Sequence, residues 1–269
     1  MSQDRALEKD ALTKAGFEVA PWASAASLDE LANAVQTIGT PAILKTRRGG
    51  YDGKGQAIIA HPADIERAWP AIREQPAVLE KMLRFDRELS LVAARAADGE
   101  MAFYPLVENE HRQGILRVTI APATGVPDML GTEARAMAQK LMAALDHVGV
   151  LTIEFFEVGG RLIANEFAPR VHNSGHWTID GATTSQFENH VRAVMNLPLG
   201  SAQPLGPTLM LNCIGTMPDP KAVLSCPDAR LHDYRKRPRP GRKIAHVNVR
   251  DCTGERAHGL AETFGIDLG

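Results

Sequence analysis

The fold is decided by the stretch Ile163-Ala-Asn-Glu-Phe-Ala-Pro-Arg-Val-His-Asn-Ser-Gly-His176. Its first part is apolar and predicts a short strand over Leu162–Phe167, with Asn165 and Glu166 in the middle. Pro169 ends that strand. The polar side chains that follow belong to Arg170, His172, Asn173, Ser174 and His176. Burying so many polar groups is costly unless ligands use them, so we interpret the segment as part of a ligand site.

A second strand precedes this stretch and is expected to pair with it. The residues Leu151-Thr-Ile-Glu-Phe-Phe-Glu-Val158 are followed by Gly159-Gly160, a dipeptide typical of hairpin turns. The loop has two residues or, if Arg161 joins it, three. Because side chains alternate along a strand, this one residue decides which side chains face each other across the hairpin.

The register of the hairpin bears on a metal site. A two-residue loop places Glu154 opposite Asn165, whereas a three-residue loop places Glu154 opposite Glu166. We favour the three-residue loop, which puts two carboxylates and an amide oxygen on one side. Such oxygens repel one another unless a hard cation such as Mg²⁺ lies between them. The alternative, that Glu154 and Glu157 merely face solvent, stays open.

The composition is that of an ordinary globular protein. The chain has 269 residues, 44% of them hydrophobic, and a formal net charge of -2, which gives no reason to expect a nucleic-acid partner. Cys213, Cys226 and Cys252 are far apart and odd in number, as is usual in a reducing cytoplasm. We find neither a leader peptide nor an apolar run of the ~20 residues that span a bilayer, and therefore expect a cytoplasmic protein.

Helices and strands alternate in the first part of the chain, which predicts a small α/β unit. A Ser-x-x-Glu capping box at Ser27 starts one of its helices. The expected helices are 6–15, 27–39 and 63–72, and the expected strands are 41–45, 56–60 and 77–82.

From Arg87 onward longer strands predominate, which predicts a second region with an antiparallel sheet. The expected strands are 88–96, 101–107, 115–121, 208–214, 230–234 and 243–249. The expected helices are 129–147, 184–195 and 255–264. The apolar stripe of the first of these helices indicates core packing.

A glycine-rich loop lies between two expected strands and reads Gly49-Gly-Tyr-Asp-Gly-Lys-Gly55. It is neither a Walker loop nor a Rossmann fingerprint, since both of those join a strand to a helix. Its main-chain N–H groups, with Arg48 and Lys54, could bind phosphates, and Lys45 could reach the same phosphates. A flexible hairpin tip is the simpler alternative.

Seven motifs together carry a resemblance to a known family. They are Ser2-Gln-Asp-Arg5, Ala42-Ile-Leu-Lys45, Gly49 to Gln56, Tyr104-Pro-Leu, His111 to Arg117, Asn165 to Trp177 and Arg239-Pro-Gly-Arg-Lys243. The chain resembles the ATP-grasp superfamily and, within it, the N5-carboxyaminoimidazole ribonucleotide synthase family. The resemblance implies an α/β (α+β) fold of the ATP-grasp type, in which a small α/β lid subdomain packs on a larger, mainly antiparallel sheet domain with helices.

The resemblance implies that ATP binds between these two regions. The residues that it implies around the nucleotide are Arg5, Lys45, Gly50, Tyr51, Asp52, Gly53, Lys54, Gly55, Gln56, Glu80, Lys81, Met82, Leu83, Glu88, His111, Asn165 and Glu166. Glu154 and Glu166 would hold Mg²⁺, or Mn²⁺ in its place.

An acceptor site is implied by the same resemblance. Arg170, His172, Asn173 and Ser174 would face bicarbonate and the ribonucleotide. Its 5′-phosphate would bind the basic residues Lys236, Arg239, Arg242 and Lys243. Lys45, Arg170 and His172 would act in catalysis.

The implied reaction is the ATP-dependent carboxylation of 5-aminoimidazole ribonucleotide with bicarbonate, through carboxyphosphate, in de novo purine biosynthesis. The partners would be small molecules, with no nucleic acid and no membrane, and the chain would form a homodimer as in the family. The expected division is 1–20 (a linker helix after an N-terminal domain that is absent), 21–83, 84–200 and 201–269.

Three other functions are possible for such a sequence. One is another ATP-grasp carboxylate–amine ligase, and a second is an ATP-binding chain with little carboxylation activity. The third is nucleic-acid binding by Arg235–Lys243, which the negative net charge and the shortage of neighbouring aromatic residues beyond Tyr234 disfavour.

Overall fold

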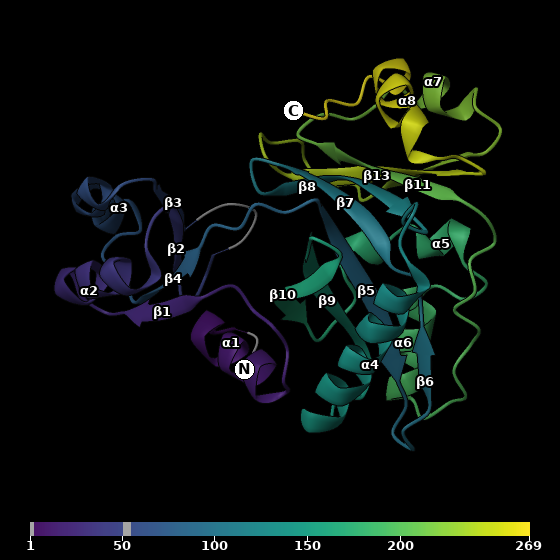
Figure 1. The fold of residues 1–269 in the computed structure, drawn as a ribbon. Helices are drawn as coiled ribbons and strands as arrows, with labels where there is room; N and C mark the ends of the chain where they lie inside the picture. The colour runs from purple at the N-terminus through teal and green to yellow at the C-terminus, as the bar shows by residue number, and fades with distance from the viewer. Residues whose placement is uncertain (1–2, 51–54) are drawn as a thin grey trace. The chain divides into compact units, whose positions relative to one another are not determined.

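The computed structural model describes residues 3–50 and 55–269 (Figure 1). They divide into two compact units. The first unit comprises the residues up to Asp86 together with Phe155–Phe167, and the second comprises Arg87–Glu154 and Ala168–Gly269. The finer division expected from the sequence stays a prediction.

The first unit is a small antiparallel sheet covered by two helices. Its helices are α1 (Arg5–Lys14), α2 (Leu28–Ile38) and α3 (Ile65–Ala71), and its strands are β1 (Trp22–Ala25), β2 (Ala42–Thr46), β3 (Gln56–Ile59) and β4 (Ala77–Lys81), in the order β1-β4-β2-β3. The helices α2 and α3 pack on one face of this sheet (Figure 1). The predicted N-cap at Ser27 is confirmed, because Ser27 Oγ accepts from Glu30 N, but the Glu30 carboxylate accepts from Ala26 N in place of the Ser27 N of a full capping box.

The second unit contains most of a long mainly antiparallel sheet. Its strands are β5 (Arg87–Arg95), β6 (Met101–Phe103), β7 (Val107–Arg112), β8 (Ile115–Ala121), β11 (Thr208–Ile214), β12 (Ala229–Asp233) and β13 (Lys243–Arg250), together with part of β9 (Gly149–Val158). With β10 (Arg161–Ala168), the strand order is β10-β9-β5-β7-β8-β11-β13-β12, and β6 pairs with β5. Its helices are α4 (Asp128–Ala144), α5 (Thr178–Gly181), α6 (Gln186–Val194), α7 (Pro220–Leu224) and α8 (Ala257–Phe264). The short helices α5 and α7 are missing from the sequence prediction.

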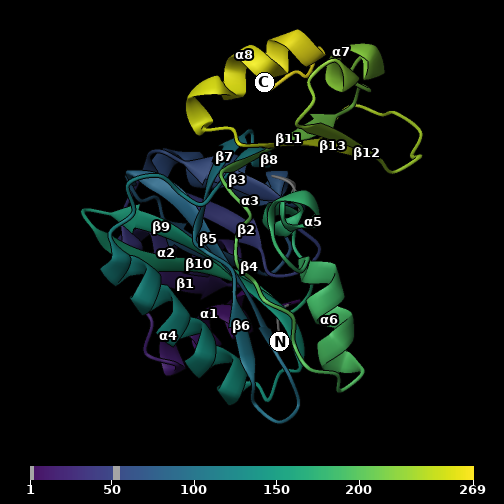
Figure 2. The same cartoon turned by 90° about the vertical axis from the view of Figure 1, so that its right-hand side faces the viewer.

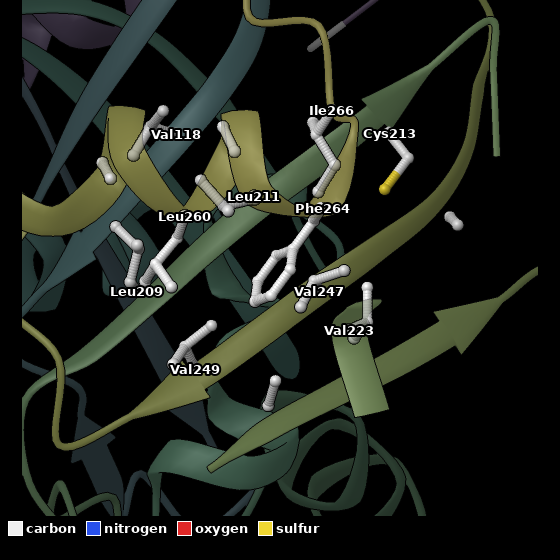
Figure 3. Packing of buried hydrophobic residues seen from close by; sticks show 14 of the residues in the cluster. Val118, Leu209, Leu211, Cys213, Val223, Val247, Val249, Leu260, Phe264 and Ile266 are labelled. Carbon is white, nitrogen blue, oxygen red and sulfur yellow. The ribbon is translucent and has the colours of Figure 1, made fainter. Parts of the chain in front are cut away.

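The last three strands have two different faces. Because successive side chains of a strand point to opposite faces, Val247 and Val249 lie on one face of β13, and His246 and Asn248 on the other. The apolar face packs against α7 and α8, where Phe264 fills the centre of a buried cluster (Figures 2 and 3). The polar face is buried as well.

The favoured register of the hairpin is wrong. The strand β9 ends at Val158 and β10 begins at Arg161, so the loop is Gly159-Gly160 alone. Both glycines have positive φ, 56° and 76°, as a two-residue type I′ turn requires. Arg161 therefore belongs to the strand, and the register that would place Glu154 directly opposite Glu166 is excluded.

Two further expectations concern the whole chain. Within residues 3–50 and 55–269, the structure contains no helix with the length and apolar character that crossing a bilayer requires. Cys213, Cys226 and Cys252 are all free thiols.

Candidate active site

A buried ion cluster joins three segments of the first unit. The Glu80 carboxylate on β4 forms an ion pair with Lys45 Nζ on β2, at 3.1 Å, and another with Lys9 Nζ on α1, at 2.9 Å. Lys9 Nζ also donates to the main-chain oxygen of Asn165 on β10, at 2.8 Å. Burial alone would raise the pKa of Glu80, but the two lysines outweigh burial and hold that pKa at about 2. Glu80 is therefore a fixed negative charge between two cations.

The helix α1 supplies two more contacts to the same strand. Arg5, Glu8 and Lys9 lie on one face of the helix, as their spacing requires. Arg5 Nη1 pairs with the Glu166 carboxylate at 3.0 Å, and Glu8 Oε1 accepts from Phe167 N at 2.6 Å. Burial, followed by the negative charge of Glu166, raises the pKa of Glu8 to about 8.

The glycine loop follows β2, as expected. Thr46 N donates to Gly55 O at 2.8 Å and closes the base of the loop, and Arg5 reaches Gly50 O. Gly55 has φ +71°, and a Cβ there would lie 2.7 Å from Thr46 Oγ1, so glycine is required at this position. The predicted residues Tyr51, Asp52, Gly53 and Lys54 lie outside the described residues. Gln56 opens β3 opposite Lys45.

The end of β4 is held by main-chain contacts. Lys81 Nζ donates to Thr40 O at 3.0 Å, and Met82 N donates to Pro41 O at 3.1 Å. Leu83 follows in irregular structure. This main chain, which was predicted to lie beside the nucleotide, is thus anchored to the segment before β2.

In the second unit, two predicted nucleotide residues are direct neighbours. His111 Nδ1 on β7 lies 2.9 Å from Glu88 Oε2 on β5. The register of β7 against β8 shifts between Glu110 and His111, which re-aims the histidine side chain.

His172 also contacts a carboxylate, that of Glu154. Its Nε2 lies 3.1 Å from Glu154 Oε1, and its Nδ1 accepts from Ser174 N. An accepting Nδ1 places the ring proton on Nε2, so His172 donates to Glu154. Burial would raise the pKa of Glu154, but the hydrogen bond and charge of His172, together with the charges of His111 and Arg170, lower that pKa on balance.

A buried chain of hydrogen bonds supports this histidine. Ser90 Oγ donates to Ser174 Oγ at 2.8 Å, and Asn109 and Thr119 continue the chain. Gln186 holds the main chain of His172 through both its amide atoms, at 3.0 and 2.7 Å. The segment after β10 is therefore fixed from both sides.

The basic residues predicted for the phosphate lie at and before β13. Lys243 Nζ donates to Asn173 Oδ1 and to His176 Nδ1. Lys236 Nζ lies 4.9 Å from the ring centroid of Tyr234. The other two residues predicted for the phosphate, Arg239 and Arg242, have exposed side chains, as does Arg170, which was predicted to face bicarbonate and the ribonucleotide.

Sequence reasoning missed several residues that the structure places beside the predicted ones. Glu8 and Lys9 were overlooked, although their i, i+3, i+4 spacing with Arg5 is a visible signal. Tyr234, His232 and His246 were overlooked as well. Their signal is weaker. Polar and apolar residues alternate along β12 and β13, which marks His232 and His246, and Tyr234 directly follows β12.

Comparison with known proteins gives a consistent answer. Residues 10–187 match the model of the ATP-grasp domain, and residues 208–258 match that of the phosphoribosylaminoimidazole carboxylase C-terminal domain. The N5-carboxyaminoimidazole ribonucleotide synthase of Pseudomonas aeruginosa is 48% identical over 250 residues, which are 93% of this chain and 69% of that protein.

Solved structures agree. The N5-carboxyaminoimidazole ribonucleotide synthetase of Thermus thermophilus has a TM-score of 0.90 at 46% identity, over 97% of this chain and 71% of that one. The enzyme of Aspergillus clavatus, in complex with ADP and 5-aminoimidazole ribonucleotide, has a TM-score of 0.87 at 32% identity, over 97% and 71%. The predicted fold class is confirmed. The chain belongs to the N5-carboxyaminoimidazole ribonucleotide synthase family of the ATP-grasp superfamily.

Proposed function

We propose that this chain is a ligase that carboxylates 5-aminoimidazole ribonucleotide with bicarbonate at the expense of ATP, in purine biosynthesis. The products are N5-carboxyaminoimidazole ribonucleotide, ADP and phosphate. The observation that carries the proposal is the 48% identity to a synthase of this name over 93% of the chain. A related structure that holds ADP together with the ribonucleotide supports the same pair of ligands.

The chemistry explains why ATP is needed. Bicarbonate is a poor electrophile, so its oxygen first attacks the γ-phosphorus of ATP and ADP leaves. The resulting carboxyphosphate loses phosphate and delivers carbon dioxide beside the amine, which forms the new N–C bond and releases a proton. The protein's contribution is mainly to position the reactants and to stabilise charge in a site protected from water.

The first unit would serve the nucleotide. Arg5, Lys45 and the amides of the glycine loop would neutralise phosphate charge. The contacts of Lys45 and Lys9 with Glu80 support this role, because they fix the ammonium of Lys45 at the base of the loop. Asn165 and Glu166 on β10 would also contact the nucleotide.

Glu154 and Glu166 would hold Mg²⁺, or Mn²⁺, and the metal would neutralise charge on the transferring phosphoryl group. The donor set fits a hard cation, since both groups are carboxylates and the pKa of Glu154 is lowered. Among the described residues, no three His, Cys, Asp or Glu side chains form a metal cluster of their own. A site with two carboxylates needs further oxygen ligands, which phosphates can supply.

The second unit would serve the acceptor. Arg170 and His172 would hold the anionic acceptor in line, with Asn173 and Ser174 beside them. Lys236, Arg239, Arg242 and Lys243 would bind the 5′-phosphate. The hydrogen bond of Lys243 to Asn173 supports a shared site, because it joins the two predicted groups.

We also propose a cytoplasmic homodimer. Three free thiols are consistent with a reducing compartment. Exposed apolar side chains on and after α6, at Val191, Val194 and Met195, offer a surface for a second copy. Light scattering at micromolar concentration should give twice the chain mass, and a monomer would contradict the dimer.

The test of the function is a phosphate-release assay combined with labelled bicarbonate. Phosphate release should require ATP, a divalent cation and bicarbonate, and label should enter the ribonucleotide in equal amount when the amine is present. A rate of phosphate release that depends on neither bicarbonate nor the ribonucleotide would contradict the proposal. Lys45→Met should abolish the activity and serve as the negative control.

A further inference from the structure

The polar face of β11 and β13 is unusual because it is buried. Asn212, His246 and Asn248 are at most 1% exposed, although each carries several hydrogen-bonding atoms. They are neighbours across the sheet, since Asn212 pairs with His246 and Asn248 follows two residues later on β13. Apolar residues would be less costly at such positions, so this layer calls for an explanation.

The layer is covered by the segment that was predicted to bind the acceptor. Asn248 Nδ2 donates to His176 O at 3.2 Å and to Asp180 Oδ2 at 2.7 Å. Asp180 Oδ2 also lies 2.7 Å from His232 Nε2. Asn212 Nδ2 reaches Asn173 Oδ1 at 3.3 Å. The polar face of the sheet is thus bonded to residues 173–180 at several points.

Two histidines at the centre of this layer are neutral. Lys243 donates to Nδ1 of His176 at 3.0 Å, so this nitrogen carries a lone pair. Burial, assisted by the charge of Lys243, lowers the pKa of His176 to about 2. Burial likewise lowers the pKa of His246. Neutral acceptors can fix the direction of an ammonium group without cancelling its charge.

The Tyr234 hydroxyl links the two rings. Its oxygen lies 3.0 Å from His176 Nδ1 and 2.5 Å from His246 Nδ1. Within the described part of the chain, His246 Nε2 is buried and has no hydrogen-bond partner, so His246 bonds through its Nδ1 side to Tyr234. The ring of His232 stacks on His246 with centroids 4.4 Å apart and closes the layer.

We propose that Tyr234, backed by His246, is a positioning residue for the acceptor: it fixes His176 so that Lys243 and Asn173 are held in the orientation that binds the phosphate of the ribonucleotide. The inference rests on the proposed function. Tyr234 itself does not contact the reacting atoms. It acts through the imidazole of His176, to which Lys243 is bonded.

The deciding variant is Tyr234→Phe, which removes only the hydroxyl. We expect KM for 5-aminoimidazole ribonucleotide to rise about tenfold, while KM for ATP and kcat stay within about twofold of the wild type. The chain offers a matched control in Tyr104→Phe. The Tyr104 hydroxyl is also buried in the second unit and bonds Thr184 O at 2.8 Å and Asn189 Nδ2 at 2.9 Å. Its removal should lower Tm and leave both KM values unchanged.

A second pair of variants keeps the test valid if Tyr234→Phe folds poorly. His176→Leu removes the acceptor for Lys243 and should raise KM for the ribonucleotide at least as much. His176→Asn restores an acceptor near the Nδ1 position and should recover most of that loss.

Two results would overturn the inference: an unchanged KM for the ribonucleotide in Tyr234→Phe and His176→Leu, or an equal rise in Tyr104→Phe. If the wild-type chain neither binds nor carboxylates the ribonucleotide, the proposed function is contradicted instead. The two failures are therefore distinguishable.

Discussion

The two units bury polar groups in different ways. In the first unit the cluster around Glu80 is ionic, and the Glu80 carboxylate lies between the ammonium groups of Lys9 and Lys45. In the second unit the buried rings of His176 and His246 are neutral and are joined by a hydroxyl. The first arrangement fixes three chain segments through opposite charges. The second orients one cation through neutral acceptors, so the choice between ions and neutral groups follows what each region has to hold.

In the first unit, the largest loss of activity is expected from a change at Glu166. Glu166→Gln removes one charge from the proposed metal site without changing the volume, and we expect kcat to fall roughly 1,000-fold with Tm nearly unchanged. Steady-state phosphate release at saturating Mg²⁺ measures the effect. Glu18→Gln is the matched control, because Glu18 forms an exposed pair with Arg161 in the same unit and should be neutral. Full activity of Glu166→Gln would remove Glu166 from the metal site.

The ion cluster itself is tested by Lys9→Met. The change leaves Glu80 buried with one cation fewer, so we expect the free energy of unfolding to fall by about 3 kcal/mol. Urea denaturation measures the loss. Lys14→Met, at the exposed end of the same helix, is the control and should change stability by less than about 0.5 kcal/mol. Equal stability of the two variants would show that Lys9 is not part of a necessary ion cluster.

A change at Glu8 is expected to have a smaller effect on the free energy of unfolding, and this effect should depend on pH. Its pKa is raised from 4.5 to about 8, so the folded state binds more protons than the unfolded state between these values. Stability contributed by the neutral carboxyl is complete below pH 4.5 and is lost as pH rises toward 8.

Glu8→Gln keeps a neutral amide at this place. The variant should therefore be more stable than the wild type at pH 8, by roughly 1 kcal/mol, and should lack this part of the fall in stability with pH. Chemical denaturation at several pH values from 5 to 8 measures it. Parallel stability curves for the variant and the wild type would contradict a neutral Glu8.

Local patterns were sufficient for much of the fold and for the individual residues. Lys45 stands in a motif that could be read from the sequence, Glu80 was implied by the family resemblance, and Ser27 caps α2 as predicted. The contact of Lys9 with Glu80 could not be read in the same way. It joins residues far apart in the chain, and only the docking of α1 brings them together.

Two other limits have physical causes. The dipeptide Gly159-Gly160 is compatible with loops of two or three residues, and only the start of β10 at Arg161 decides between them. The alternation along β13 predicts one polar face, and such faces are usually exposed to water. That face is buried because residues 173–180 cover it, which no local pattern reveals.

We infer that the ion cluster of Lys9, Lys45 and Glu80 supports the binding of ATP, and that the neutral layer of Tyr234, His176 and His246 supports the binding of the ribonucleotide. The most direct test is to measure KM for ATP and KM for 5-aminoimidazole ribonucleotide in Lys9→Met and Tyr234→Phe, below the unfolding temperature of both variants. We expect Lys9→Met to raise only KM for ATP and Tyr234→Phe to raise only KM for the ribonucleotide. A rise of both constants by the same factor in both variants would contradict the division of labour between the two clusters.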